Sequence, residues 1–333
     1  MVDDAHITLI TGASGFLGSH LVRHLSAQGH SVRALYNSTL PSDELRELKG
    51  VDWQQADLLD IFDVERVMEG VSKVYHCAAI VSFAPKDKER MVHFNIEATK
   101  HIVNECIERG ISRIVYVSSV AALGRNAEAK EITEEEQWEE SKYNSTYAYS
   151  KHRAELEVWR GVGEGLHANI VCPGVILGEG NWEVGSANLL KVVAQEFPFY
   201  TDGVNSFVDV KDVVKAMYLL MEGDVQDERF ILSAGNFPYK RIFTLMARQL
   251  GVRPPHIHAS RWMTELVWRW KAIQAFITGK QHTITKETAA TAQRKTYYNN
   301  TKLPQYIPDF QYTAIEDTIG RMAEAYKAQK VNE

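Results

Sequence analysis

The stretch ITLITGASGFLGSHLV, residues 7–22, joins a short β-branched run to a helical pattern through a turn that holds three glycines. The run ends at Thr11, and Gly12, Gly15 and Gly18 follow at a regular spacing of three. Without a Cβ atom, a glycine lets the backbone turn tightly and lets a ligand approach the main chain closely. The order strand, glycine turn and helix is typical of the first unit of a parallel nucleotide-binding sheet.

The helix after this turn is expected to run from Phe16 to about Gln28. Its N-terminal amides and the positive end of its dipole would face an anion, so we expect the pyrophosphate of a dinucleotide there. A tight turn with a purely structural role is the alternative. The residues expected to contact the cofactor at this turn are Gly12, Ser14, Gly15, Phe16, Leu17 and Gly18.

β-branched runs continue to alternate with helical patterns through the first two thirds of the chain. Further strands are expected at residues 30–36, 51–57, 73–79, 112–119 and 167–174. Helices are expected between them, among them residues 91–109 and a helix that begins near Thr146. This alternation predicts an α/β fold with a doubly wound parallel Rossmann sheet that is covered on both faces.

Beyond Pro173 the alternation loosens. We predict an NAD(P)-binding Rossmann domain over residues 1–175 and a smaller C-terminal substrate lobe over residues 176–333, interleaved with the last sheet strands around residues 204–236. Within this lobe, residues 261–279 carry apolar side chains at helical spacing, which predicts a packed face, with a lipid-surface contact as the alternative. These side chains are Trp262, Leu266, Trp270, Ile273 and Ile277.

The composition, with 45% hydrophobic and 24% charged residues, is that of an ordinary globular protein. The formal net charge of −6 provides no basic surface, so no nucleic-acid partner is expected. Cys77, Cys106 and Cys172 show no metal-like spacing, so we expect no metal site and free thiols in a reducing compartment. The sequence shows no signal peptide and no apolar run of the roughly 18 residues of a membrane span, so the cytoplasm is the expected location.

Residues at the end of the second strand should contact the ribose of the adenosine. An acid about 20 residues after the glycines would accept from the 2′-hydroxyl and favour NAD. This chain has Asn37 there and Arg33 just upstream, with no acid before Asp43. That pattern leans towards NADP, with NAD as the alternative. Arg33 is equally well interpreted as a surface residue of the strand.

The glycine turn and five further motifs identify a resemblance. TGASGFLG, ADLLD, HCAA, VYVSSVAALG, YAYSK and PGVILGEG occur in this order. The chain therefore resembles the extended short-chain dehydrogenase/reductase family, which includes the NAD-dependent epimerases and dehydratases. Within it the chain looks most like the dihydroflavonol-reductase-like branch, which is similar to hydroxysteroid dehydrogenases.

The resemblance implies roles by position. It implies a catalytic set of Ser119, Tyr147 and Lys151, in which Lys151 also contacts the cofactor. It implies that Asp57 and Leu58 flank the adenine. Reductases of this branch often carry an arginine at the position of Asn37, where it holds the 2′-phosphate of NADP. The remaining cofactor residues implied are Ala78, Ala79 and Ile80 after the fourth strand, and Pro173, Gly174 and Val175 beside the nicotinamide.

The stretch STYAYSK, residues 145–151, would place two of the implied catalytic side chains at the start of a helix. Residues four apart share a helix face, so Tyr147 and Lys151 would project together, whereas Tyr149 has no lysine four residues later. An ammonium beside a phenol lowers its pKa from about 10. Ser119 could donate to a substrate oxygen, and Tyr147 could then donate a proton as general acid. An ordinary polar helix start is the alternative, and the neighbouring Ser118 is interpreted as structural.

Substrate contacts are predicted from the loops that follow the strands. Each of these residues has loop or core packing as its alternative, and the acidic stretch at residues 131–140 is expected to be a solvated loop. The candidates are Ser82, Phe83, Asn181, Trp182, Ser186 and Tyr200.

We therefore expect an NAD(P)-dependent oxidoreductase that reduces a ketone or aldehyde, or oxidises a secondary alcohol. Its substrate is expected to be a small molecule, and an apolar compound is one option. A nucleotide-sugar epimerase or dehydratase is the alternative, weakened because residues 173–251 contain only Arg229, Arg241 and Arg248 to bind a diphosphate. A non-catalytic cofactor-binding protein is a lesser alternative. The resemblance also implies a possible homodimer through the helices at residues 91–109 and 146–159.

Overall fold

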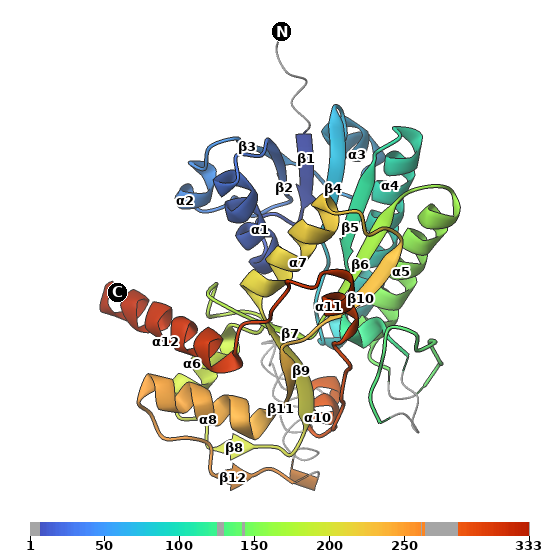
Figure 1. Cartoon of the computed structure of the whole chain (residues 1–333). Helices are drawn as coiled ribbons and strands as arrows, with labels where there is room; N and C mark the ends of the chain where they lie inside the picture. Colours follow the sequence, from blue (N-terminus) through green and yellow to red (C-terminus); the bar gives the residue numbers. More distant parts are fainter. Residues whose placement is uncertain (1–6, 125–129, 142–143, 261, 264–285, 333) are drawn as a thin grey trace.

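The computed structural model describes residues 7–124, 130–141, 144–260, 262–263 and 286–332. Within them, seven parallel strands form one sheet in the order β10-β6-β5-β4-β1-β2-β3 (Figure 1). The chain starts at the centre with β1, moves outward through β2 and β3, and then returns to build β4, β5 and β6 on the other side. The doubly wound parallel sheet expected from the sequence is confirmed. Its strands are β1 (Ile7–Thr11), β2 (Val32–Tyr36), β3 (Val51–Gln55), β4 (Val71–His76), β5 (Arg113–Val117), β6 (Ala168–Pro173) and β10 (Glu228–Leu232).

Both faces of this sheet are covered by helices, so strands inside the sheet bury residues of both faces. Leu9 and Ile10 are adjacent in β1 and fully buried, but they belong to core clusters on opposite faces. One face packs on α1 (Phe16–Ala27) and α7 (Val210–Glu222). The other packs on α3 (Ile61–Val67), α4 (Lys88–Glu108) and α5 (Thr146–Gly163), and α2 (Asp43–Arg46) lies between β2 and β3 along the chain.

A smaller lobe lies beyond the carboxyl ends of the strands, towards the bottom of Figure 1. Its three-stranded sheet has β9 (Val204–Asp209) between β7 (Val175–Leu177) and β11 (Gly235–Pro238). The chain leaves this sheet after β9, returns to the large sheet through α7 and β10, and re-enters at β11. The other elements near the lobe are α6 (Asn188–Ala194), β8 (Phe199–Tyr200), α8 (Tyr239–Leu250), β12 (Ile257–His258), α10 (Lys286–Ala292), α11 (Lys302–Tyr306) and α12 (Ile315–Asn332).

The prediction that residues 131–140 form a solvated loop is wrong at two positions. Ile132 and Glu134 are each only 6% exposed. Ile132 forms an isolated parallel bridge with Tyr298, and a Glu134 carboxylate oxygen accepts the backbone N–H of Ile231 at 2.8 Å. Ile231 belongs to the edge strand β10, whose N–H groups need partners, so the acidic loop completes the hydrogen bonding of the sheet.

Two other expectations concern a membrane span and the helix at residues 261–279. None of the described helices is long and apolar enough to cross a bilayer. The helix expected at residues 261–279 lies largely outside the described residues, as do Leu266, Trp270, Ile273 and Ile277. Trp262 is described and is 66% exposed.

Candidate active site

The glycine turn after β1 has the geometry that only glycine allows. Gly12 has a φ of +64°, and a Cβ on it would lie 2.8 Å from backbone atoms of Ala78. A Cβ on Gly18 would lie 2.2 Å from the carbonyl oxygen of Gly12. The turn is therefore packed against both the chain after β4 and its own helix. At Gly15 an added Cβ would meet only the Gly12 oxygen, at 3.1 Å, among the described residues.

The N-terminus of α1 has the free donors that an anion needs. Gly15 is its N-cap and supplies no side-chain acceptor, and the first helical turn carries no acid. The first amides of a helix have no partner within the helix, so those of α1 are available to a pyrophosphate. Ser14 and Gly15 are exposed at this turn, whereas Leu17 is buried. The residues present thus fit a dinucleotide.

The ends of β2 and β3 hold the residues expected near the adenosine. Asn37 and Asp57 are exposed just after these strands, and Leu58 is buried. Arg33 points elsewhere, because its Nη1 donates to the carbonyls of Val67 at 2.8 Å and Glu69 at 2.6 Å. These contacts cap the end of α3 and leave the Arg33 side chain only 13% exposed, so it is not the surface residue considered from the sequence.

A buried histidine that the sequence analysis missed joins β1 to β4. His76 is fully buried, with Nδ1 2.7 Å from the Thr11 hydroxyl and Nε2 3.0 Å from the Thr99 hydroxyl. The Thr99 hydroxyl donates to the carbonyl of Asn95 at 2.7 Å, so it must accept from Nε2–H. Nε2 therefore carries a proton. Burial lowers the pKa of His76 to about 3, which keeps it uncharged.

The same network fixes the chain after β4. The Thr11 hydroxyl accepts the backbone N–H of Ala78 at 3.1 Å, so one hydroxyl links the strand before the glycine turn to the predicted cofactor wall. Asn95, which the sequence analysis also missed, is 2% exposed. Its side chain accepts from the backbone N–H of Ile80 at 2.8 Å and donates to the backbone carbonyl of Ile80 at 3.0 Å. Polar residues on the buried side of a strand or helix are the signal that would have identified both. Ala79 lies between Ala78 and Ile80, whose backbone N–H groups are both bonded to side chains.

The pair Tyr147 and Lys151 lies on the first turns of α5. Ser145 caps this helix by accepting the N–H of Ala148 at 3.0 Å, so the helix begins at Thr146 as expected. Lys151 is 2% exposed; its Nζ donates to the carbonyl of Val117 at 2.7 Å. Burial lowers the pKa of Lys151 to about 8, and the charge of Glu155 opposes this shift.

The hydroxyl of Tyr147 meets the side chain of Ser119. Burial raises the pKa of Tyr147 above 10, and its hydrogen bond with Ser119 opposes the increase. This net direction is opposite to the expected one, because burial outweighs the stabilisation of the phenolate. Ser119 follows β5 and also accepts the N–H of Ala121 at 3.2 Å. The ring of Phe83 packs edge-on to Tyr147, with ring centroids 5.8 Å apart.

The turn after β6 is packed closely against the small lobe. Pro173 ends β6, and a Cβ on Gly174 would lie 2.2 Å from the Ser206 hydroxyl. That hydroxyl is buried without a hydrogen-bond partner among the described residues. Val175 then starts β7.

All these positions lie along one edge of the sheet. Parallel strands end at the same edge, and the crevice beside a switch in strand order, here between β1 and β4, is where such sheets bind ligands. The glycine turn follows β1, Asn37 follows β2, Ser119 follows β5 and Pro173 ends β6. The arrangement can hold an extended dinucleotide across the strand ends, with the Ser119–Tyr147 contact at one end of it.

The other predicted substrate residues have contacts that match their packing alternative. Trp182 is 7% exposed, and its indole N–H donates to the side chain of Gln329 at 2.8 Å. The Ser82 hydroxyl donates to Asp87 at 2.7 Å, and the Asn181 side chain accepts the N–H of Glu183 at 2.9 Å. Ser186 donates to the carbonyl of Ile176, and Lys240 lies over the ring of Tyr200 at 4.2 Å. Of the six candidates, Phe83 is the one with a described contact to a residue of the predicted catalytic set, Tyr147.

Comparisons with known proteins agree with this geometry. The NAD dependent epimerase/dehydratase family matches residues 8–233. The chain is 28% identical over 307 residues to a protein of Synechocystis sp. that is named a dihydroflavonol 4-reductase, covering 90% of this chain and 88% of that protein. It is 29% identical over 243 residues to cinnamoyl-CoA reductase 1 of Petunia hybrida, covering 68% and 72%.

Solved structures share the whole architecture. The crystal structure of gox2253 superposes with a TM-score of 0.82 at 27% identity, covering 97% of this chain and 98% of that one. The UDP-glucose 4-epimerase of Thermotoga maritima superposes with a TM-score of 0.78 at 19% identity, covering 97% and 99%, and shares the fold.

Proposed function

The chain belongs to the NAD-dependent epimerase/dehydratase family, and we propose that it reduces a ketone or aldehyde, or oxidises the corresponding secondary alcohol, at Ser119, Tyr147 and Lys151. It is an NAD(P)-dependent oxidoreductase by family and by its relatives. The observation that carries the proposal is the hydrogen bond between Ser119 and Tyr147, with Lys151 one turn along the same helix.

Each of the three side chains has a separate role in the reaction at the substrate oxygen. A bound nicotinamide supplies or accepts the hydride. The Ser119 hydroxyl donates a hydrogen bond to the carbonyl oxygen as negative charge develops there. Tyr147 donates its proton to that oxygen during reduction and takes it back during oxidation. The Lys151 ammonium stabilises the phenolate that remains and holds the nicotinamide ribose.

The cofactor proposed is NADP in preference to NAD. Support comes from the end of β2, where the exposed Asn37 takes the place of the acid that would repel a 2′-phosphate. The substrate proposed is a small carbonyl compound with an apolar part, because the aromatic ring of Phe83 lies beside the reacting phenol.

A nucleotide-sugar epimerase is the second candidate, since the same family and fold include epimerases. Such an enzyme needs cations for a substrate diphosphate. Two of the three arginines in residues 173–251 are engaged within the protein: Arg229 pairs with Glu155 at 2.7 Å, and Arg241 pairs with Glu316 at 2.8 Å. These pairs favour the reductase.

A substrate panel separates the two candidates. Purified protein is incubated with ketones, aldehydes and secondary alcohols of graded apolar size, and the reduced nicotinamide is followed by its absorbance with each cofactor. The proposal predicts turnover of carbonyl compounds with NADPH. Conversion of a UDP-sugar without net change in cofactor would establish the epimerase instead. Cofactor binding without turnover of either class would favour the non-catalytic alternative.

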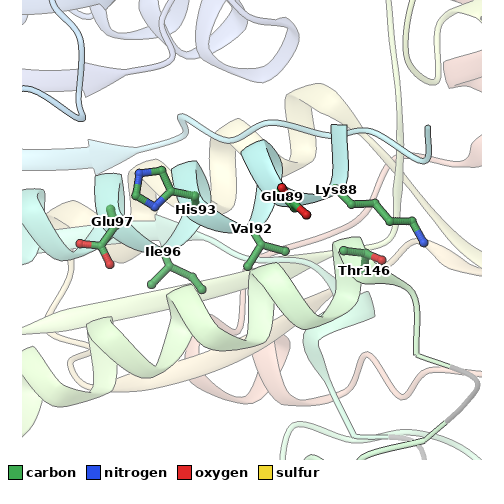
Figure 2. A pocket seen from close by; sticks show the side chains of 7 residues that line it. All are labelled: Lys88, Glu89, Val92, His93, Ile96, Glu97 and Thr146. Atoms are coloured by element: carbon green, nitrogen blue, oxygen red, sulfur yellow. The ribbon is translucent and has the colours of Figure 1, made fainter. Parts of the chain in front are cut away.

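We also propose a homodimer through α4 and α5. A hollow of about 490 Å³ lies on α4 beside the start of α5, lined by Lys88, Glu89, Val92, His93, Ile96, Glu97 and Thr146. Figure 2 shows Val92 and Ile96 reaching from α4 towards the neighbouring helix. On α5, Tyr149 is 39% and Leu156 is 43% exposed, so both helices carry apolar groups that a second copy would cover. Light scattering of the parent and of a Leu156→Glu variant tests this, with the variant expected to be monomeric.

The location proposed is the cytoplasm. The three cysteines are free, with Cys106 and Cys172 buried, as suits a reducing compartment.

A further inference from the structure

Glu155 extends the catalytic face of α5 by one turn. Tyr147, Lys151 and Glu155 are spaced four residues apart, so they share one side of the helix. Glu155 is 1% exposed. A carboxylate is costly to bury unless charged or hydrogen-bonding partners surround it, so its partners indicate what it stabilises.

Both oxygens of Glu155 are occupied. Oε2 accepts from the Ser118 hydroxyl at 2.5 Å and lies 3.9 Å from the Cys172 sulfur. Oε1 accepts from Arg229 Nη1 at 2.7 Å and from the indole N–H of Trp159 at 3.3 Å. The carboxylate therefore connects α5 to the end of β5, to β6 and to β10.

The arginine of this ion pair is itself held in place. Arg229 also donates to the backbone carbonyl of Glu134, whose carboxylate accepts the N–H of Ile231 at 2.8 Å. The acidic loop thus closes over the Glu155–Arg229 pair, which leaves the Arg229 side chain 18% and the Glu155 side chain 2% exposed.

The contacts between β5 and α5 follow one another residue by residue. The carbonyl of Val117 accepts from Lys151, the hydroxyl of Ser118 donates to Glu155, and the side chain of Ser119 bonds Tyr147. Three consecutive residues at the end of β5 are therefore each tied to one member of the Tyr147–Lys151–Glu155 face. A shift of Ser118 would move Ser119 with it.

We propose that Glu155 is a positioning residue, which fixes the end of β5 against α5 and so holds Ser119 against Tyr147 while its negative charge keeps the Lys151 ammonium in place. This inference rests on the proposed function of the three catalytic side chains. It assigns Ser118 the role of the link, which explains why two serines stand together at the strand end.

The charge around Lys151 supports this role. The groups that face it are Glu155 from its own helix, Cys172 from β6, Cys77 and His76 from the end of β4, and the ring of Tyr116 from β5. Burial raises the pKa of Cys77 to about 12 and that of Cys172 well above its ordinary value, and it lowers that of His76, so these three are neutral. Of these groups, Glu155 supplies the negative charge.

The test compares Glu155→Gln and Ser118→Ala with the matched control Glu157→Gln. Glutamine keeps an oxygen for Ser118 but loses the charge, whereas Ser118→Ala removes the link and leaves every charge in place. Glu157 lies two residues further on and pairs with Arg160 at 2.9 Å. Thermal unfolding first establishes that each variant is folded. If Glu155→Gln does not fold, the double variant Glu155→Gln/Arg229→Met replaces it, because it removes both members of the buried ion pair.

We expect Glu155→Gln to lower kcat at least tenfold and to move the alkaline limb of kcat/KM to lower pH by half a unit or more. The direction follows because loss of the negative charge makes the Lys151 ammonium release its proton at lower pH. Ser118→Ala should lower kcat without moving the limb, and Glu157→Gln should change neither. A folded Glu155→Gln variant with the parent's kcat and pH profile would overturn the proposal, as would an equal loss in all three variants.

Cofactor binding separates this inference from the proposed function. Quenching of protein fluorescence by NADPH, titrated from pH 6 to pH 10, reports the Lys151 charge without any substrate. The half-unit shift should appear there too in Glu155→Gln. If the parent turns over no carbonyl compound but the shift in binding is present, the proposed reaction fails and the effect of Glu155 on Lys151 stands. If the shift is absent from binding, the role of Glu155 fails whatever the reaction.

Discussion

The imidazole of His76 and the hydroxyl of Thr11 are joined by a 2.7 Å hydrogen bond between residues that are 65 positions apart. This bond ties the strand before the glycine turn to the strand that leads to the predicted cofactor wall. Thr99 requires a proton on Nε2, and burial keeps the ring uncharged, so Nδ1 accepts from the Thr11 hydroxyl. The position of the chain around the glycine turn is therefore supported by a buried neutral residue that need not touch the cofactor.

Stability should depend on pH through His76. Its pKa falls from 6.5 to about 3 on folding, so the unfolded chain binds a proton that the folded chain excludes. A depressed pKa of a base gives stability that is lost as pH falls below 6.5, by about 1.4 kcal/mol per pH unit until pH nears 3. In His76→Gln this contribution is absent. Urea unfolding at pH 7 and pH 5 should show the parent losing about 2 kcal/mol more than the variant; equal losses would contradict the depressed pKa and the neutral state of the buried ring.

Gly18→Ala should disrupt the glycine turn. The added methyl would lie 2.2 Å from the Gly12 oxygen and 2.8 Å from the Ala13 Cα atom, so the backbone must move, at a cost of about 1–3 kcal/mol. Affinity for the cofactor should fall with it. Gly163→Ala is the matched control, because among the described residues no atom beyond its chain neighbours and its own helix backbone lies within 4 Å of the added Cβ, and it should be neutral or stabilising by up to about 1 kcal/mol. Thermal unfolding and cofactor titration measure both effects, and a Gly18→Ala protein that binds as the parent does would refute the packing argument.

Cofactor preference should respond to Asn37 and not to Arg33. Asn37→Arg places a guanidinium at the end of β2, where it can pair with a 2′-phosphate, so kcat/KM for NADPH relative to NADH should rise about tenfold, or about 1.4 kcal/mol. Arg33→Ala should lower stability, because it removes donors from the Val67 and Glu69 carbonyls, while the preference between the two cofactors stays the same. A change of preference in Arg33→Ala would restore Arg33 as a cofactor residue.

Phe83→Ala should weaken the binding of apolar substrates. Phe83 lies edge-on to Tyr147, with ring centroids 5.8 Å apart, so its ring is placed to contact the apolar part of a substrate held at Tyr147. An aromatic contact of this kind contributes about 0.5–1.5 kcal/mol. KM for the most apolar substrate of the panel should therefore rise about two- to tenfold, with little change for the smallest carbonyl compound. Trp182→Phe is the contrasting variant: because its indole is bonded within the small lobe, it should lower the melting temperature and leave KM unchanged.

The parts of this protein that were predictable from sequence are those with short-range signals. The glycine turn, the strands and the Tyr147–Lys151 pair each lie within a few residues, so spacing alone indicates them. The bounds of helices were less accurate: the helix expected from residue 91 begins at Lys88, directly after the single 3₁₀ turn Pro85–Asp87.

The interactions that support the site join residues far apart, and the sequence carries no spacing signal for them. Glu155 and Arg229 are 74 positions apart, and Glu134 and Ile231 are 97 apart. Their pairing depends on which side of each strand faces which helix. Composition was misleading at Glu134, since a glutamate-rich stretch suggests a solvent-exposed loop. This carboxylate is instead buried and accepts the N–H of Ile231 in an edge strand. The four-residue interval from Lys151 to Glu155 was the one local indication of the buried network.

The measurement that tests the central claim most directly is the turnover number of Tyr147→Phe beside Tyr149→Phe. Both variants remove one hydroxyl from the same helix, but Tyr149 is 39% exposed and lies two residues from both Tyr147 and Lys151, a spacing that does not share a helix face. If Tyr147 is the general acid, Tyr147→Phe should lower kcat by about 10²–10⁴-fold while it still binds the cofactor, and Tyr149→Phe should match the parent. A Tyr147→Phe enzyme that turns over its carbonyl substrate at the parental rate would contradict the account.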